Sequence, residues 1–335
     1  MENQLIFVVG PPRSGSTLLA RMIGAHSLIY GRPEPHLITP LAHLGYYAKV
    51  DKAPYDPVLA AEAQRGFVED LPHGEQDYVD ACRAYCDTLY LRMLQTKPEK
   101  RFFLDKTPAY ALVLDFLAHI YPDAKYVVLT RHPLAVFSSY AESFFNGDYA
   151  AAQAYNPILD RYVPALAKFL RERPAPVYHV VYEQLVADPE RVLGEIFAFV
   201  GVPNEPQAVE YGREEPTAQG LGDPIGVKRH TRPTTESVHK WAAEIAGAPD
   251  RLQLCRQIIA RLDPNDLATW GHPLDSLWEP LEAAGGAKKS AAKTFDRYRM
   301  ERFLIVKLRA LVQKRPLLRR WLGTVRLGAD VLLRE

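Results

Sequence analysis

The stretch that decides the fold is LIFVVGPPRSGSTLLARMI, residues 5–23. Residues 5–9 are apolar and rich in β-branched side chains, which predicts a buried strand, and residues 17–23 follow a helical period. The turn between them carries Gly10 and Gly15, so successive backbone N–H groups can point at one spot, and the helix N-terminus adds the positive end of its dipole. The stretch therefore predicts an anion-binding cradle between a strand and a helix.

The cradle differs from the nucleotide-hydrolase pattern GxxxxGK[ST] in its cation. Ser16 stands where that pattern has the lysine that reaches the β- and γ-phosphates, while Arg13 lies three residues earlier. This difference weakens an interpretation as an ordinary ATPase or kinase. A strand that merely turns into a helix, with no ligand, is the alternative.

The rest of the chain alternates short apolar runs with helical patterns. Three further strands are predicted at residues 101–104, 125–130 and 177–182. Helices are predicted at residues 78–94, 112–120, 134–145, 158–171 and 189–200. Parallel strands need helical crossovers, so this order predicts an α/β fold whose mainly parallel sheet is flanked by helices on both faces. Ligands in such a fold bind outside the carboxyl ends of the strands.

Composition narrows the class of protein. The 335 residues are 47% hydrophobic, which is enough for a full core and rules out a disulfide-stapled miniprotein. With 41 Lys and Arg against 40 Asp and Glu, no global field attracts nucleic acid, and no nucleic-acid partner is expected. The three cysteines form no CxxC pair, which argues against structural zinc and fits a cytoplasmic location. No basic leader precedes the first strand, and no run approaches the ~20 apolar residues of a membrane span.

Three separated segments together resemble the sulfotransferases that use 3′-phosphoadenosine 5′-phosphosulfate (PAPS). Residues 10–17 resemble the family's 5′-phosphosulfate-binding loop, in which Arg13 occupies the position of a Lys or Arg. Arg131-His132-Pro133 followed by Ser139 resembles the family's 3′-phosphate clamp, with Ser138 as the neighbouring alternative to Ser139. The resemblance implies a fold like that of the P-loop NTPases.

The resemblance also assigns residues around the donor. Tyr182 begins a segment like the family's strand-to-helix connection, whose Tyr lies near the adenine, although a core aromatic is the alternative. Arg229 lies in a loosely similar segment and would close over the nucleotide, while the neighbouring His230 would face the acceptor. The expected donor-binding residues are Arg13, Ser14, Gly15, Ser16, Thr17, Arg131, Ser139, Tyr182 and Arg229.

Sulfuryl transfer to a hydroxyl needs a base for the acceptor proton and cations for the leaving phosphate oxygen. Arg13 is one cation, and Lys106, at the end of a predicted strand, resembles the family's Lys at the matching strand end. Glu34 lies in a loop similar to the catalytic-base loop of the tyrosylprotein sulfotransferases and to the Pro-Glu-x-His-Leu loop of sulfotransferase domains in polyketide synthases. His36 in the same loop is the second candidate base, since an imidazole titrates near neutral pH.

The expected function is transfer of a sulfuryl group from PAPS to a hydroxyl of a small-molecule, lipid or carrier-bound acceptor, as in natural product biosynthesis. The product nucleotide is then 3′-phosphoadenosine 5′-phosphate (PAP), and no metal is required, because fixed protein cations neutralise the leaving group. Two alternatives stay open: a kinase that uses ATP and Mg²⁺ with an aberrant phosphate loop, and a nucleotide-binding module that has lost turnover.

Residues 288–335 differ in composition from residues 1–287, which form the expected sulfotransferase domain. They contain fourteen Lys and Arg against four Asp and Glu, a net charge of +10. Five apolar residues lie on one helical face of this extension: Phe303, Leu304, Leu308, Leu311 and Val312. The pattern predicts a basic amphipathic extension that either docks on the core or contacts a membrane surface or an acidic partner.

Overall fold

The structure is a computed structural model that describes residues 1–33, 38, 41, 64–211, 231–235, 238–284 and 315. Its centre is a sheet of five strands in the order β2-β3-β1-β4-β5, and every pair of neighbours is parallel. The strands are β1 (Leu5–Val9), β2 (Ile29–Pro33), β3 (Phe102–Lys106), β4 (Lys125–Thr130) and β5 (Val177–Val181). The prediction of a mainly parallel sheet is confirmed.

β2 is the one strand of the sheet that the local sequence pattern does not predict. Its five residues, Ile-Tyr-Gly-Arg-Pro, include a glycine and a proline, which weaken any strand pattern. β2 lies at the edge of the sheet and pairs only with β3. A proline is tolerated in such a strand, because no further strand on the outer side needs its missing N–H. The strand is therefore specified by its neighbour more than by its own composition.

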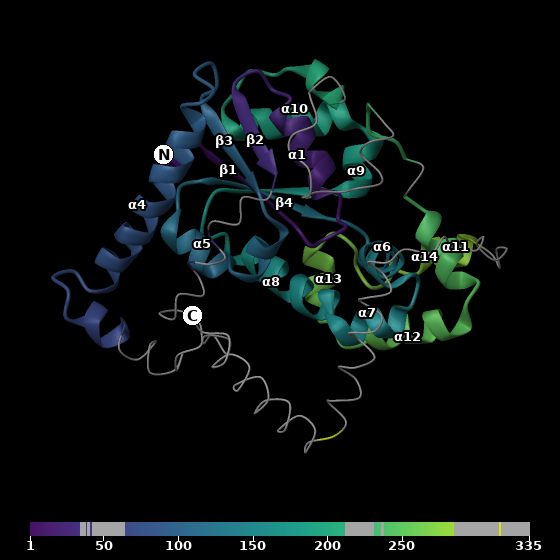
Figure 1. Ribbon diagram of the computed structural model, residues 1–335. Coiled ribbons are helices and arrows are strands. Elements are labelled where there is room, and N and C mark those ends of the chain that lie inside the picture. The colour runs from purple at the N-terminus through teal and green to yellow at the C-terminus, as the bar shows by residue number, and fades with distance from the viewer. Residues whose placement is uncertain are drawn as a thin grey trace, which may run out of the picture.

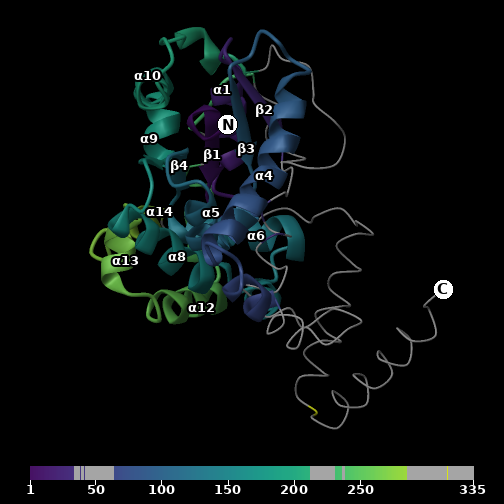
Figure 2. The same cartoon turned by 90° about the vertical axis from the view of Figure 1, so that its left-hand side faces the viewer.

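Helices cover both faces of the sheet (Figures 1 and 2). The α-helices are α1 (Ser16–Gly24), α4 (Glu75–Leu94), α5 (Leu114–Ile120), α6 (Pro133–Phe145), α7 (Tyr149–Tyr155), α8 (Ile158–Glu172), α9 (Tyr182–Ala187), α10 (Pro189–Val200), α11 (Lys240–Ala246), α12 (Pro249–Ile259), α13 (Pro264–Thr269) and α14 (Glu279–Ala284). Short 3₁₀ helices are η1 (Glu2–Gln4), η2 (Pro108–Leu112) and η3 (Pro206–Val209). Among these described helices, none combines the length and apolar character that crossing a bilayer demands.

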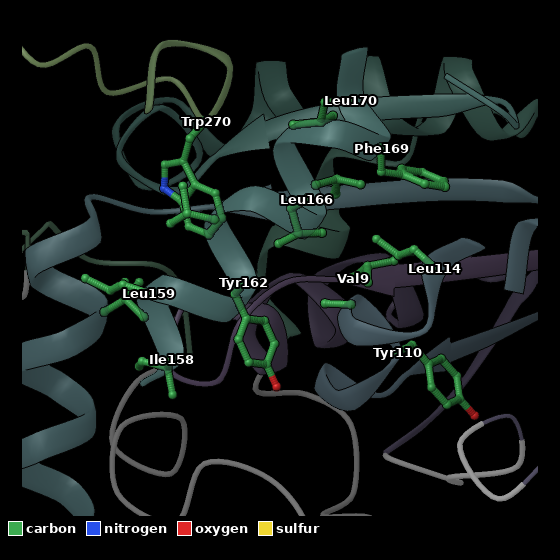
Figure 3. Close-up of a cluster of buried hydrophobic side chains, with 14 of the residues drawn as sticks. Val9, Tyr110, Leu114, Ile158, Leu159, Tyr162, Leu166, Phe169, Leu170 and Trp270 are labelled. Carbon is green, nitrogen blue, oxygen red and sulfur yellow. The ribbon is translucent and has the colours of Figure 1, made fainter. Parts of the chain in front are cut away.

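The alternation of β1 divides the core into two layers. Leu5, Phe7 and Val9 point into the larger layer, which includes side chains of α4, α5, α6 and α8, whereas Ile6 and Val8 point into the layer under α1, α9 and α10. All five residues of β1 are at most 1% exposed, as expected for a central parallel strand. Figure 3 shows part of the larger layer, in which α8 supplies much of the apolar surface.

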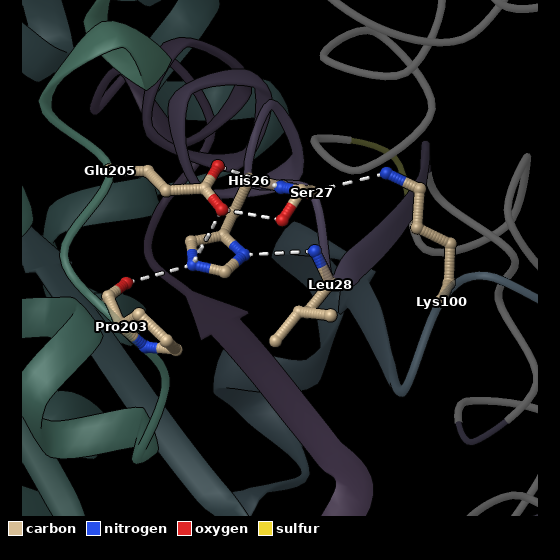
Figure 4. A network of polar contacts seen from close by, with 6 residues as sticks. All are labelled: His26, Ser27, Leu28, Lys100, Pro203 and Glu205. Atoms are coloured by element: carbon tan, nitrogen blue, oxygen red, sulfur yellow. Dashed lines mark hydrogen bonds and ion pairs between the residues drawn. The ribbon is translucent and has the colours of Figure 1, made fainter.

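A buried histidine ties the α1–β2 turn to the α10–η3 turn (Figure 4). The His26 ring accepts a hydrogen bond from the Leu28 N–H at Nδ1, 3.0 Å, so its Nε2 carries the hydrogen that it donates to the Pro203 carbonyl, 2.9 Å away. Glu205 accepts hydrogen bonds from the Ser27 N–H and hydroxyl, at 3.0 and 2.5 Å. These contacts stabilise the turns at the amino-terminal ends of the strands, opposite the carboxyl ends where a ligand site is expected.

Candidate active site

The predicted site residues of the described chain converge on the carboxyl ends of the strands. Arg13 lies in the loop after β1, Lys106 ends β3, Arg131 directly follows β4 and Tyr182 directly follows β5. Since β1 lies between β3 and β4, Lys106 and Arg131 flank the loop from opposite sides. The connection from β3 to β4 crosses from one side of β1 to the other, so β1 marks the point where the strand order reverses. Open parallel sheets bind ligands at such a point.

The loop after β1 has an unusual backbone. Arg13 adopts a φ of 72° and Gly15 a φ of 98°, and both values lie in the left-handed region. The Ser14 N–H donates to the Pro11 carbonyl at 3.2 Å, which closes the turn. α1 then begins at Ser16 without a side-chain cap, so the N–H groups of its first turn are directed toward the loop's concave side.

Ser14 gives a second sign of a ligand cradle. Its side chain is fully buried, and within the described residues its Oγ has no hydrogen-bond partner. A buried hydroxyl without a partner costs about 1–3 kcal/mol, so such a group usually serves a ligand or a bound water. The unpartnered hydroxyl is therefore consistent with the predicted anion-binding cradle.

Two glycines allow the loop to approach its neighbours closely. A Cβ on Gly10 would lie 2.7 Å from the Leu129 carbonyl oxygen and 2.9 Å from the Ser14 Oγ. A Cβ on Gly15 would lie 2.6 Å from the ring of Tyr182. Glycine is therefore required by contact at both positions, and at Gly15 by the positive φ as well.

The two predicted anion-binding groups meet at Arg13. Its Nε donates a hydrogen bond to the Ser139 Oγ at 3.1 Å, and its carbonyl accepts one from an Arg131 guanidinium N–H at 3.3 Å. The Arg131 guanidinium also stacks 4.4 Å from the centre of the Tyr182 ring. The loop at Arg13 thus forms one cationic surface with a strand end and a helix face that lie more than a hundred residues further along the sequence.

Ser138, the alternative to Ser139, is committed elsewhere. Its hydroxyl donates to Glu244 at 3.1 Å and accepts from Tyr149 at 2.8 Å, and its side chain is buried against α7 and α11. Ser139 is the serine that contacts Arg13. The geometry therefore favours Ser139 over Ser138 as part of the site.

Lys106 and Asp105 point to opposite faces of the sheet because they are consecutive strand residues. Lys106 is 1% exposed and shares the α1 face with the loop after β1. Asp105 is buried on the other face, where it accepts hydrogen bonds from the hydroxyls of Tyr90, Thr107 and Tyr110 at 2.6, 2.9 and 3.0 Å. Burial raises the pKa of Asp105 to about 6, although the three hydroxyls and Lys106 oppose the shift.

The Asp105 network reaches the segment that carries the candidate bases. The Tyr110 hydroxyl accepts a hydrogen bond from the Ile38 N–H at 3.1 Å, and Pro33 is paired with Lys106 in the sheet. The backbone is therefore placed beside Lys106 just before Glu34 and anchored again at Ile38. Glu34, His36, Arg229 and His230 themselves lie outside the described residues.

Sequence reasoning missed the Asp105 network. The only local signal was an acidic residue immediately before Lys106 at the end of an apolar strand, and its partners on α4 and η2 come from tertiary packing.

The sequence predicts no metal requirement for the reaction. Within the described part of the chain, no group of three or more His, Cys, Asp or Glu side chains is arranged to hold a metal ion.

Comparisons with known proteins agree with this arrangement. A family model described as "Sulfotransferase family" matches residues 5–206. The nodulation protein NoeE of Sinorhizobium fredii is 37% identical over 135 residues, which is 40% of this chain and 30% of NoeE. Protein-tyrosine sulfotransferase 2 of Gallus gallus is 25% identical over 307 residues, or 81% of this chain and 73% of the relative. The chain spans 26% of an uncharacterized Aquifex aeolicus relative and 48% of a protein-tyrosine sulfotransferase of Drosophila melanogaster.

Solved structures give the same fold. The sulfotransferase domain of the Synechococcus PCC 7002 olefin synthase has a TM-score of 0.50 and 25% identity, covering 77% of this chain and 95% of the domain. The sulfotransferase domain from the curacin biosynthetic pathway also has a TM-score of 0.50, with 24% identity, covering 77% of this chain and 98% of the domain. The predicted P-loop type of fold is confirmed, and so is the resemblance of the chain to the sulfotransferase family.

Replacing Gly15 with Ala tests the close approach to Tyr182. Gly15→Ala is expected to lower the free energy of unfolding by about 2–4 kcal/mol, because the left-handed backbone and the buried ring both resist a Cβ. Gly201→Ala is the matched control, since Gly201 has a φ of 88° but nothing within 4 Å of the added carbon. Urea denaturation of both variants gives the comparison, and equal losses would show that Tyr182 does not restrict the loop.

Asp105 gives a pH-dependent prediction. With a pKa raised from 3.8 to about 6, the folded state holds a proton that the unfolded state has released between these values, so this group stabilises the fold less as pH rises through 6. The free energy of unfolding should therefore fall by about 1 kcal/mol more in the wild type than in Asp105→Asn between pH 5 and pH 7. Parallel curves for the two proteins in urea titrations would contradict the raised pKa.

Proposed function

The chain belongs to the sulfotransferase family, and we propose that it transfers a sulfuryl group from PAPS to a hydroxyl of a small-molecule, lipid or carrier-bound acceptor and releases PAP. The observation that carries this proposal is the meeting of two cationic groups at Arg13, which contacts both Ser139 and Arg131. A ligand with two anionic ends on one nucleoside matches two such groups set side by side.

The loop after β1 fits the 5′-phosphosulfate end of the donor. Backbone N–H groups at the start of α1 and the unpartnered hydroxyl of buried Ser14 are donors for anionic oxygens. The residues proposed to hold this end are Arg13, Ser14, Gly15, Ser16 and Thr17. No acidic side chain occurs in this loop, so every charged group in it attracts an anion.

Arg131 and Ser139 fit the 3′-phosphate. A guanidinium can donate two parallel hydrogen bonds to phosphate oxygens. The Ser139 hydroxyl accepts from Arg13 through a lone pair and keeps its own O–H to donate to a third oxygen. Tyr182 is 6% exposed, and one face of its ring stacks on the Arg131 guanidinium. We therefore propose that the edge of the Tyr182 ring contacts the adenine.

The chemistry needs charge stabilisation on one side and a base on the other. As the acceptor oxygen bonds to sulfur, the bond from sulfur to the phosphate oxygen of the donor breaks and leaves negative charge on that oxygen. Lys106 and Arg13 are proposed to stabilise this charge. Glu34 is proposed to take the acceptor proton, with His36 as the second candidate, and the anchors at Pro33 and Ile38 support a base beside Lys106.

The remaining assignments follow from the sequence. Arg229 is proposed to close over the nucleotide. A carrier-bound hydroxyl is a reasonable acceptor because similar domains occur in an olefin synthase and in the curacin pathway. Residues 1–287 are proposed as the catalytic domain, and the basic residues 288–335 as an extension that contacts an acidic partner or a membrane surface.

Calorimetry separates this function from the alternatives. The protein is expected to bind PAP without metal at least tenfold more tightly than it binds adenosine 5′-monophosphate or ATP with Mg²⁺, because only PAP reaches both cationic groups. Tightest binding of ATP with Mg²⁺ would favour a kinase. Tight PAP binding with no sulfated product from a broad panel of alcohols, followed by mass spectrometry, would favour a silent nucleotide-binding module.

Arg13→Ala is expected to lower kcat about a hundredfold with a smaller rise in the KM for PAPS, since the charge is needed most as the leaving oxygen becomes negative. Steady-state kinetics with an alcohol accepted by the wild type measures both constants. Arg161→Ala is the matched control, because Arg161 is exposed on α8 and its guanidinium donates to the Asn156 side chain at 3.2 Å, away from the site. Unchanged turnover in Arg13→Ala would remove this side chain from the mechanism.

A further inference from the structure

The main chain at Arg131 is held by a residue far along the sequence. The indole Nε1–H of Trp270 donates a hydrogen bond to the Arg131 carbonyl at 2.8 Å, across 139 residues. Trp270 is fully buried, and Figure 3 shows its ring within the larger core layer. The carbonyl of Arg131 therefore has a fixed direction that β4 alone does not supply.

The N–H of the same peptide group, which belongs to His132, is held from the other side. The N–H of His132 donates to Glu183 Oε1 at 3.1 Å, and the other oxygen of Glu183 lies 3.4 Å from His272 Nε2. Burial raises the pKa of Glu183, but its contacts with His272 and the His132 N–H outweigh burial, so the net pKa is lowered. Glu183 therefore stays ionised near neutral pH and keeps accepting the hydrogen bond from the His132 N–H.

His132 itself adds no cation to the site. Its ring stacks on Trp241 with centroids 4.2 Å apart, and its Nε2 donates to the Leu277 carbonyl at 3.0 Å. Burial, helped by His272 nearby, lowers the pKa of His132 to about 3, so the ring is neutral. Arg131 is thus the charged group at this strand end, and its neighbour serves to attach it to the α11–α14 region.

Gly271 lets Trp270 contact the Arg131–His132 peptide group directly while His272 lies beside Glu183. It adopts a φ of 95°, and a Cβ there would lie 3.0 Å from the Val181 side chain at the end of β5. The turn between α13 and α14 therefore lies directly across the ends of β4 and β5. We call Trp270, Gly271 and His272 the supporting turn.

The guanidinium of Arg131 is fixed as well, because it stacks on Tyr182 and donates to the Arg13 carbonyl. With peptide and guanidinium both held, little conformational freedom remains to be lost when a phosphate binds. A loosened Arg131 would lower affinity for the 3′-phosphate more than for the 5′-phosphate, since the loop after β1 is also held by its Ser14–Pro11 hydrogen bond and by the Tyr182 ring against Gly15.

We propose that the supporting turn positions Arg131 and thereby sets the preference of this site for a nucleotide bearing a 3′-phosphate over one that lacks it. The supporting turn lies in the C-terminal region of the chain, outside residues 5–206, the part that the family model matches. The inference rests on the proposed function, because it presumes that Arg131 binds the 3′-phosphate.

Two substitutions test the supporting turn through separate contacts. Trp270→Phe keeps an aromatic ring in the core but removes the N–H, and His272→Leu removes the partner of Glu183. Each is expected to reduce the ratio of the dissociation constant of adenosine 5′-monophosphate to that of PAP about tenfold, while affinity for the monophosphate changes less than twofold. Isothermal titration calorimetry on the full chain measures both constants. His272→Gln, which retains a donor, is expected to recover most of the ratio.

Matched controls exclude a general effect of the substitutions. Trp278→Phe changes a partly buried tryptophan of the same region, and His119→Leu breaks an exposed histidine–carboxylate pair with Glu75, so both should keep the wild-type ratio. If either test variant weakens both nucleotides equally, or neither, the proposal is wrong. If Trp270→Phe does not fold, the less buried His272→Leu decides. A wild type that does not prefer PAP would overturn the proposed function instead.

Discussion

A turn that presents its backbone N–H groups to a ligand cannot also use them in a sheet or a helix, and the remainder of the site is arranged around that constraint. The loop after β1 holds Arg13 and Gly15 in left-handed conformations and leaves the Ser14 hydroxyl without a partner in the described chain. The left-handed backbone of Arg13 and the unpartnered hydroxyl each cost of order 1–3 kcal/mol, whereas glycine at position 15 adopts its positive φ without strain. The strand before it, buried on both faces, and the Tyr182 ring against Gly15 hold the turn in place despite that cost.

The cations of the site lie at the carboxyl ends of the strands, and its buried carboxylates lie behind them. Arg13, Lys106 and Arg131 gather at the carboxyl edge of the sheet, while the carboxylates of Asp105 and Glu183 lie behind them, bound to hydroxyls or to a backbone N–H. Carboxylates placed behind the cations reduce the cost of gathering positive charge without occupying the side that faces a ligand. With a pKa of about 6, Asp105 is mostly ionised at neutral pH and so contributes to this balance.

Local patterns predicted the part of the structure that local physics determines. The runs at residues 5–9 and 125–130 became β1 and β4 because each is an apolar, β-branched segment that a parallel sheet buries on both faces. The run at residues 177–182 became the edge strand β5, Val177–Val181, which is only partly buried. The strand at Ile29–Pro33 was missed because its pairing with β3 outweighs its glycine and proline. The helices between residues 240 and 284 are short, and their positions depend on docking against α6 and α8 more than on their own periodicity.

The site also combines residues that a local sequence pattern can identify with residues that only tertiary packing brings to it. Arg13, Arg131 and Ser139 could be identified from motif spacing, whereas Trp270 could not, because its contact with Arg131 spans 139 residues and leaves no local pattern. The two proposed anion-binding groups consequently draw their order from different sources. The loop after β1 is shaped by its own glycines and by Tyr182, but the Arg131 carbonyl is held only once the C-terminal helices have docked. Local opening of that region would therefore loosen Arg131, the group proposed for the 3′-phosphate, more than the loop proposed for the 5′-phosphosulfate.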